Sequence, residues 1–184
     1  MPMLTDLGRD PMTIRHNVLQ GEFEVSRDPH LVLTTVLGSC IACCLFDPVA
    51  KVGGMNHFLL ASPPNGMNGL GDDARRYGLY AMELLVNEMI KQGAVRATMR
   101  AHLYGGANLH SGMRAIGTEN ARFAEGFLKA DSIQLVRSDT GGVQARRLDL
   151  QPATGRVRCR SVQGDFPSIQ AARVPVPSGD VELF

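Results

Sequence analysis

The stretch LVLTTVLGSCIACCLF, residues 31–46, decides how this chain folds. It is rich in apolar and β-branched residues, which favour strands, and Gly38-Ser39 interrupts it. Because glycine adopts backbone conformations that a strand does not use, we expect a buried strand, a turn at Gly38-Ser39 and a second buried strand. Asp47-Pro48 marks the next turn, and residues 51–60, KVGGMNHFLL, return as a further strand.

Two other segments have helical patterns. The first begins at Asp72 or Asp73, either of which can cap a helix, and runs to about Lys91. Its apolar residues share one stripe and are expected to be buried: Leu79, Met82, Leu85, Val86 and Met89. The second helix is expected from about Thr118 to Ala130. Strand patterns occupy residues 22–27, 97–104, 133–139, 144–150 and 156–162.

Because helices and strands do not strictly alternate, the sequence predicts an α+β fold, in which helices cover one face of layered, mixed sheets. We expect one domain over residues 13–162. A flexible lead-in at residues 1–12 precedes it, and a C-terminal arm or tail at residues 163–184 follows it, where few apolar residues are scattered among proline, serine and glycine.

Composition argues against several classes of protein. Of the 184 residues, 44% are apolar and 20% are charged, which is typical of a globular protein. Lys and Arg total 19 against 18 for Asp and Glu, and this net charge of +1 argues against nucleic-acid binding. We see no secretory signal, and residues 31–46 are too short and too polar to span a bilayer. We therefore expect a cytoplasmic protein without membrane insertion, whose cysteines stay reduced.

The four cysteines allow several interpretations. Cys40 and Cys43 match the C-x-x-C pattern of redox pairs and zinc sites. In a strand, however, residues three apart point to opposite sides, and the chain has no second C-x-x-C or H-x-x-x-H to complete a metal site. Cys43, Cys44 and Cys159 are best explained as small buried apolar residues, and we expect no bound metal.

Cys40 differs from the others because of the residues before it. A turn at Gly38 and Ser39 would leave nearby N–H groups free, and a thiol beside such donors suits acyl transfer with an oxyanion hole. A nucleophilic thiol also needs a base. His57 lies in a strand that can pair with that of Cys40, and Gly54, with the glycine before it, could admit a substrate or a neighbouring backbone. From these residues alone, a structural role for His57 remains an alternative.

Several motifs occur in one order along the chain: LGSC at 37–40, GGMNHF at 53–58, RAHLYGGAN at 100–108, IGTEN at 116–120, DTGG at 139–142 and RRLDLQPATGRV at 146–157. Together they resemble the CheD family of chemoreceptor glutamine deamidases, and the resemblance covers about residues 22–162. It implies a cysteine-dependent protein-glutamine glutaminase, which converts selected glutamines of bacterial chemoreceptors to glutamate. It also implies a layered α/β/β sandwich like that of cysteine hydrolases.

The resemblance also assigns residues. The family's catalytic cysteine follows Gly-Ser and its histidine follows Gly-Gly-x-x, and these positions match Cys40 and His57. A threonine shortly before the cysteine completes the set. Thr34 and Thr35 both compete for this role, and we favour Thr34, six residues before Cys40. A shift of one residue turns a strand side chain to the other face, so only one of the two can reach the site. Backbone groups near Gly38, Ser39 and Gly54 are expected to bind the oxyanion or position the substrate.

The implied mechanism transfers the Cys40 proton to His57, giving an ion pair, and proceeds through a thioester that water hydrolyses. It needs no metal and no organic cofactor. The implied partners are the cytoplasmic domain of a chemoreceptor (a methyl-accepting chemotaxis protein) and a phosphatase of the chemotaxis response regulator. The alternative function is a mainly non-catalytic adaptor that binds the receptor or that phosphatase.

Overall fold

A computed structural model describes residues 11–60, 72–109 and 116–162, apart from the side chains of residues 72–76. The expected C-terminal arm, most of the lead-in, His110 and most of the loop before the first helix lie outside these residues. Within them the chain forms two helices and two sheets, both of mixed strand direction, which confirms the α+β class. Among the described residues, no helix is long and apolar enough to cross a membrane.

The larger sheet has five strands in the order β2-β5-β4-β6-β7. All its neighbours are antiparallel except β6 and β7, which run parallel. Its strands are β2 (Phe23–Ser26), β5 (Val52–Asn56), β4 (Ile41–Asp47), β6 (Arg100–Gly105) and β7 (Gln134–Thr140).

The smaller sheet has four strands in the order β1-β3-β8-β9, and only β1 and β3 run parallel. Its strands are β1 (Ile14–Asn17), β3 (Leu31–Leu37), β8 (Ala145–Gln151) and β9 (Arg156–Val162).

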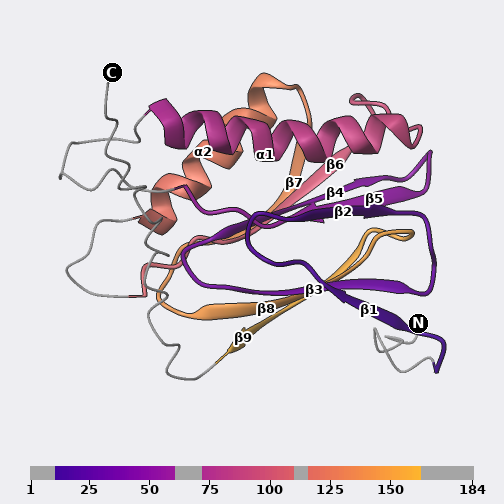
Figure 1. Cartoon of the computed structure of the whole chain (residues 1–184), viewed down its shortest axis with the longest axis horizontal. Helices are drawn as coiled ribbons and strands as arrows, with labels where there is room; N and C mark the ends of the chain where they lie inside the picture. Colours follow the sequence, from indigo (N-terminus) through magenta and orange to yellow (C-terminus); the bar gives the residue numbers. More distant parts are fainter. Residues whose placement is uncertain (1–10, 61–71, 110–115, 163–184) are drawn as a thin grey trace, which may run out of the picture.

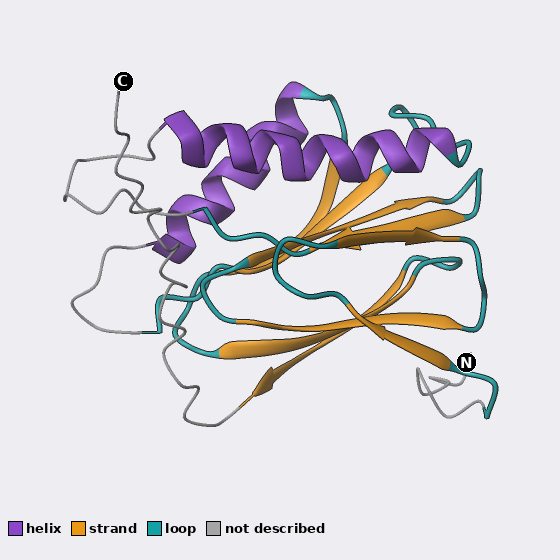
Figure 2. Cartoon of the chain, viewed as in Figure 1, coloured by secondary structure: helices purple, strands orange, loops and turns teal. Residues whose placement is uncertain are grey.

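Both helices cover the outer face of the five-stranded sheet, and the four-stranded sheet packs on its other face (Figure 1, Figure 2). Helix α1 spans Asp72–Lys91 and α2 spans Ile116–Ala130. The first matches the expected bounds, and the second begins two residues before Thr118. Alternation along the middle strands divides the core. Ile41, Cys43 and Leu45 of β4 pack under the helices, whereas Ala42 and Cys44 face the other sheet.

One expected core residue is wrong. Leu79 is 43% exposed, whereas the other four residues of the predicted stripe are buried or nearly so. The buried stripe instead continues from Met82 to Gly78, where a side chain would collide with Leu60 and Phe123. Because successive helix residues are about 100° apart, Leu79 lies at the edge of this stripe, about 20° from Val86, and its exposure shows that this part of the edge is left uncovered.

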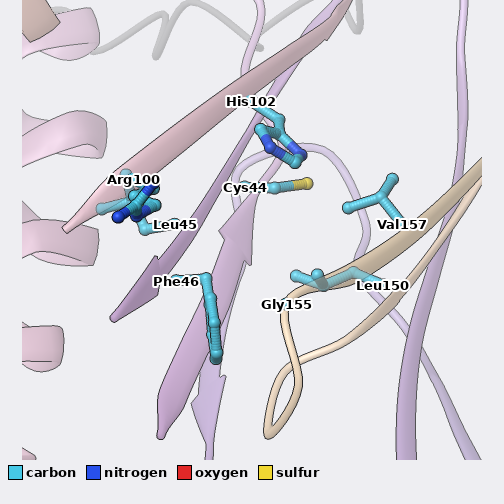
Figure 3. A pocket seen from close by; sticks show the side chains of 8 residues that line it. All are labelled: Cys44, Leu45, Phe46, Arg100, His102, Leu150, Gly155 and Val157. Atoms are coloured by element: carbon cyan, nitrogen blue, oxygen red, sulfur yellow. The ribbon is translucent and has the colours of Figure 1, made fainter. Parts of the chain in front are cut away.

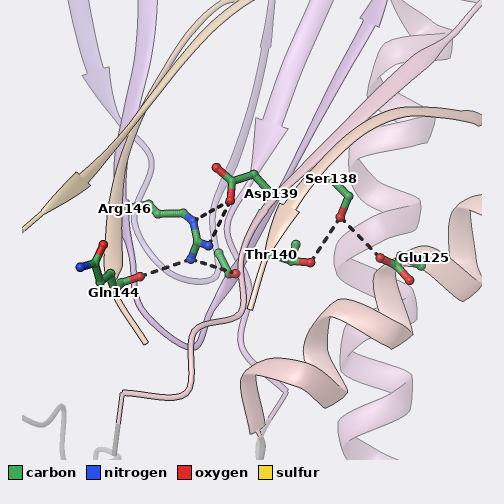
Figure 4. Close-up of polar contacts among 7 residues, drawn as sticks. Glu125, Ser138, Asp139, Thr140, Gln144 and Arg146 are labelled. Carbon is green, nitrogen blue, oxygen red and sulfur yellow. Dashed lines mark hydrogen bonds and ion pairs between the residues drawn. The ribbon is translucent and has the colours of Figure 1, made fainter. Parts of the chain in front are cut away.

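Arg146 joins the two sheets at one edge (Figure 4). From β8 it forms an ion pair with Asp139 of β7, with 3.1 Å between Nη2 and Oδ1. Its Nη1 also donates to the Gly105 carbonyl at 3.5 Å. On the other side of β7, the Ser138 hydroxyl lies 3.5 Å from the Glu125 carboxylate, which links β7 to α2. These contacts tie this edge of the five-stranded sheet to the layers on both of its faces.

Candidate active site

Cys40 lies where the chain crosses from one sheet to the other. Strand β3 ends at Leu37 in the four-stranded sheet, and β4 begins at Ile41 in the five-stranded sheet. The predicted interruption at Gly38-Ser39 is this crossing, and Cys40 is the first residue after it. Its side chain is 7% exposed and packs in the core between the sheets.

His57 emerges on the same side of the five-stranded sheet as Cys40. Strands β4 and β5 pair in antiparallel fashion, and a bridge between Ile41 and Phe58 extends the pairing beyond β5. One residue along, His57 lies opposite Ala42, and opposed residues of an antiparallel pair point to the same side. Cys40 and Ala42 share that side because they are two residues apart.

Thr35, rather than Thr34, lies beside the imidazole. Its Oγ1 is 3.0 Å from Nδ1 of His57 and donates to the Val18 carbonyl at 2.8 Å. Thr34 instead contacts the carboxyl of Asp149, its partner across the pairing of β3 with β8. The structure therefore brings Thr35, and not the favoured Thr34, to His57, and we propose Thr35 for the role that the resemblance gives to a threonine. Spacing to Cys40 does not settle which face of β3 turns inward, and this face carries Thr35.

These contacts define the tautomer of His57. Thr35 has one proton, which it gives to Val18, and a carbonyl only accepts. Nδ1 lies near two acceptors, the Thr35 hydroxyl and the Val18 carbonyl at 3.2 Å, so Nδ1 carries the ring proton. Nε2 is left as the unprotonated nitrogen, and it is buried without a hydrogen-bond partner among the described residues.

Burial favours the neutral form of both groups. It raises the pKa of the Cys40 thiol to about 11, against a smaller opposite effect of the residue's own backbone N–H. Burial also lowers the pKa of His57, against the opposing effects of the Val18 carbonyl and the Glu22 charge. At neutral pH the site therefore holds a thiol and an uncharged imidazole.

One further side chain contacts the thiol, and another lies near it. The Cys40 thiol donates to Oε1 of Gln20, with 3.4 Å between the sulfur and the oxygen. Tyr77 of α1 is close enough that ionised Cys40 would raise its pKa, in addition to the larger effect of burial. Sequence reasoning missed both residues, because neither stands in a recognisable motif.

Asn120 holds together the segments that carry Cys40 and His57. This fully buried side chain on α2 donates from Nδ2 to the Ser39 carbonyl at 2.8 Å. Its Oδ1 accepts from the backbone N–H of Leu60, three residues after His57, at 3.1 Å. A polar residue inside the predicted second helix was the available sequence signal, since a buried amide must be hydrogen-bonded.

Glycines allow the β6 turn to close on the Cys40 crossing. Gly106 donates to the Cys40 carbonyl at 2.7 Å, and Ala107 donates to the Gly38 carbonyl at 2.9 Å. Gly105 has a φ of 105°, and a Cβ there would lie 2.2 Å from the Cys40 carbonyl oxygen. The turn after β6 therefore packs directly against the backbone of the candidate nucleophile.

Gly54 does not border the site, contrary to expectation. It lies opposite Leu45 in the sheet, and a Cβ there would meet Val25 and Leu85 on the helix side. That side is the one away from Cys40. Gly54 is thus explained by close packing of the sheet with its neighbours, the second of the two alternatives that the sequence left open.

The remaining cysteines lie apart from the site. Cys43 points toward the helices, on the face opposite Cys40, as strand alternation predicts. All four cysteines are free, and burial raises the pKa of Cys43 to about 12. Within the described ranges, no three His, Cys, Asp or Glu side chains form a group that could hold a metal ion.

A small cavity of about 60 Å³ lies elsewhere between the sheets (Figure 3). Cys44 and His102 reach it from neighbouring strands, and Leu150 and Val157 close it from the other sheet. Burial and the nearby Arg137 charge lower the pKa of His102. None of the candidate site residues lines this cavity.

Comparison with known proteins gives consistent family relationships. A family model described as CheD chemotactic sensory transduction matches residues 59–161. The chain is 51% identical over 170 residues to a probable chemoreceptor glutamine deamidase CheD of Zymomonas mobilis, covering 92% of each chain. It is 50% identical over 178 residues to a protein of the same name from Caulobacter vibrioides, covering 93% of this chain and 94% of that one.

Solved structures give a weaker likeness. The hypothetical protein YfiH of Bacillus licheniformis aligns with a TM-score of 0.43 and 15% identity, over 64% of this chain and 50% of that one. A Neisseria meningitidis protein of the DUF152 family aligns with a TM-score of 0.47 and 11% identity, over 71% of this chain and 65% of that one.

Proposed function

This chain belongs to the CheD family of chemoreceptor glutamine deamidases, and from that premise we propose that it hydrolyses selected glutamine side chains of a bacterial chemoreceptor to glutamate and ammonia. The observation that carries the proposal is His57, whose Nδ1 is occupied by Thr35 and Val18, whose Nε2 has no hydrogen-bond partner among the described residues, and which lies on the same side of the sheet as Cys40. A buried imidazole with one orienting partner and one free nitrogen suits a general base.

In the proposed first step, Nε2 of His57 accepts the Cys40 proton as the sulfur attacks the amide carbon of the substrate. The neutral state of both groups supports proton transfer during attack rather than an ion pair at rest. Bound substrate would also exclude water, which strengthens the attraction between thiolate and imidazolium. Thr35 orients the ring throughout by accepting from Nδ1.

Backbone N–H groups at the crossing would then bind the developing oxyanion. The N–H of Cys40 lies close enough to its own sulfur to affect the thiol pKa, which puts a donor beside the reacting atom. The Gly38 and Ser39 carbonyls are held by Ala107 and Asn120, so the crossing has a defined conformation. One such donor contributes about 3 kcal/mol to lowering the barrier.

His57 would next protonate the leaving nitrogen, which departs as ammonia. The same nitrogen, Nε2, then activates water to hydrolyse the thioester, and the thiol returns to its neutral state. This chemistry corresponds to a cysteine hydrolase, which agrees with the α/β/β layering. It takes place between the sheets at the crossing, with Tyr77 and Gln20 at its border.

Mass spectrometry of receptor cytoplasmic fragments after incubation with the protein tests the proposal. Each conversion of glutamine to glutamate adds about one mass unit. We expect conversion by the wild type and none by Cys40→Ala. If a folded wild-type protein converts no glutamine in any receptor of the host but still binds receptor fragments, it is an adaptor and the deamidase proposal is wrong. The same fragments, and the response-regulator phosphatase, serve as bait for the binding measurement.

A further inference from the structure

We propose that Gln20 is an internal substrate, which Cys40 of the same chain deamidates to a glutamate at position 20. This inference rests on the proposed deamidase activity. Its basis is the contact between the Cys40 thiol and the side-chain amide oxygen of Gln20, at 3.4 Å. The chemical group that the enzyme is proposed to hydrolyse is thus already at its nucleophile.

A defined turn holds Gln20 in this position. The backbone N–H of Glu22 donates to the Leu19 carbonyl at 3.0 Å, so Gln20 and Gly21 are the central residues of a β-turn. Gly21 has a φ of 91°, the conformation that a glycine supplies at the third position of such a turn. The Glu22 carboxylate closes the turn from the other side by accepting from the Leu19 N–H at 2.9 Å.

The same turn is attached to the segment of His57 and to β3. Gly21 donates to the His57 carbonyl at 2.7 Å, and the His57 N–H donates to the Glu22 carbonyl at 3.0 Å. Just before the turn, the Val18 N–H donates to the Thr34 carbonyl at 2.9 Å. Gln20 therefore projects from a backbone fixed on either side of it, although its own side chain is exposed. Holding two groups together in this way greatly raises their effective concentration.

The observed contact brings the two groups together but is not yet the geometry of attack. The thiol faces the amide oxygen, and attack requires it to face the carbon Cδ. Rotation about the last side-chain torsion of glutamine, which is broad, moves the oxygen away from the sulfur without moving Cδ. The oxygen can then turn toward the Cys40 N–H, which lies beside the sulfur.

The reaction is balanced with water as the only co-reactant. His57 takes the thiol proton as the Sγ–Cδ bond forms and returns it to Nε2 of Gln20 as the Cδ–N bond breaks, releasing ammonia. Water then adds to Cδ, the Sγ–Cδ bond breaks and the sulfur recovers a proton. The product is a carboxylate at position 20, which changes the formal net charge from +1 to 0, since +1 − 1 = 0.

Peptide mass spectrometry of the purified full chain tests the inference. We expect the peptide containing position 20 to be about one mass unit heavier in wild type than in Cys40→Ala and Cys40→Ser. Gln134, exposed on β7, should remain unconverted in all three proteins and reports spontaneous deamidation. Two Cys40 variants are used so that the test still stands if one of them fails to fold. Thermal melting shows whether each is folded.

A mixing experiment tests whether the reaction is internal. Isotopically labelled Cys40→Ala protein incubated with unlabelled wild type should keep its Gln20. Conversion of the labelled chain, or equal conversion of position 20 in wild type and both variants, would overturn the inference.

The same wild-type preparation is assayed on receptor fragments. If receptor glutamines are converted while Gln20 stays intact, the inference is wrong and the proposed function stands. If neither is converted, the proposed function itself fails.

Discussion

The hydroxyl of Thr35 lies 3.0 Å from Nδ1 of His57 and donates a hydrogen bond to the Val18 carbonyl. These contacts fix which of the two ring nitrogens of His57 carries the proton. Nδ1 donates inward, and Nε2 is the nitrogen that can take a proton from a substrate or from Cys40. The threonine thus bears on the chemistry through the tautomer of the histidine.

Thr35→Val should lower kcat by about fivefold, the equivalent of about 1 kcal/mol for one hydrogen bond. The isosteric change removes the acceptor for Nδ1 while keeping the volume of the side chain. Thr34→Val is the matched control. It should keep kcat within about twofold, because Thr34 contacts Asp149 instead. Steady-state ammonia release gives both values, and a larger loss from Thr34→Val would contradict the assignment.

Cys40→Ala should abolish ammonia release, whereas Cys43→Ala should retain it. Both side chains are buried, but only Cys40 lies on the face of His57. Removing the Cys43 sulfur should instead lower the melting temperature, because it leaves a gap under the helices. Calorimetry and the ammonia assay separate the two effects. Equal loss of activity in a folded Cys43→Ala protein would refute the choice of nucleophile.

Activity should persist at mildly acidic pH. Burial favours the neutral imidazole and so lowers the pKa of His57 below its ordinary value of about 6.5. The base therefore stays unprotonated as the pH falls through about 6.5, and kcat/KM should decline only below that value. A pH profile with its acidic limb at or above about 6.5 would show that the imidazole is not held as described.

The same shift makes a prediction for stability. Between about pH 6.5 and the lower pKa of folded His57, the unfolded chain binds more protons than the native protein. Stability should therefore fall as the pH falls through this window. His57→Gln should reduce that dependence, and urea unfolding at a series of pH values measures it. An unchanged pH slope in the variant would count against a neutral, buried His57.

Asn120→Ala should lower both stability and activity. It leaves the Ser39 carbonyl and the Leu60 N–H without their partner, at a cost of about 1–3 kcal/mol for each buried group. Asn120→Asp keeps an acceptor for Leu60 but loses the donor to Ser39, so it isolates the contact beside Cys40. Asn87→Ala, on the exposed face of α1, is the control for both. If Asn120→Asp retains full kcat, this contact does not position the nucleophile.

Gly105→Ala should unfold or inactivate the protein, because its Cβ would lie 2.2 Å from the Cys40 carbonyl oxygen in a backbone with a φ of 105°. Gly126→Ala is the opposite case. Nothing lies within 4 Å of a Cβ there, and alanine favours a helix over glycine by about 1 kcal/mol. It should raise the melting temperature. A tolerated Gly105→Ala would show that the turn after β6 does not press on the crossing.

Residue patterns were sufficient for much of the fold. Strand alternation and the Gly38-Ser39 interruption predicted β3 and β4, and the helical pattern predicted α1 with its observed bounds. The separation of Cys40 from Cys43 also followed from alternation alone. These features are local, and each depends on the chain a few residues to either side.

Other features were beyond local reasoning. The position of Leu79 depended on where α2 crosses α1, which no periodicity within α1 encodes. The sequence could not tell whether Gly54 makes room for a substrate or for a neighbouring backbone. The two alternatives differ only in which face of β5 meets the helices.

By itself, the sequence determined most of the strands along the chain, the break between two of them and, through its motifs, the family, and it predicted Cys40 and His57 as the catalytic pair. Only the tertiary structure decided that Thr35 turns to the imidazole, that Asn120 joins the two segments and that Gln20 meets the thiol. Alternation fixes which residues of a strand share a face. Which face turns inward, and what it meets there, is set by the packing of one sheet on the other.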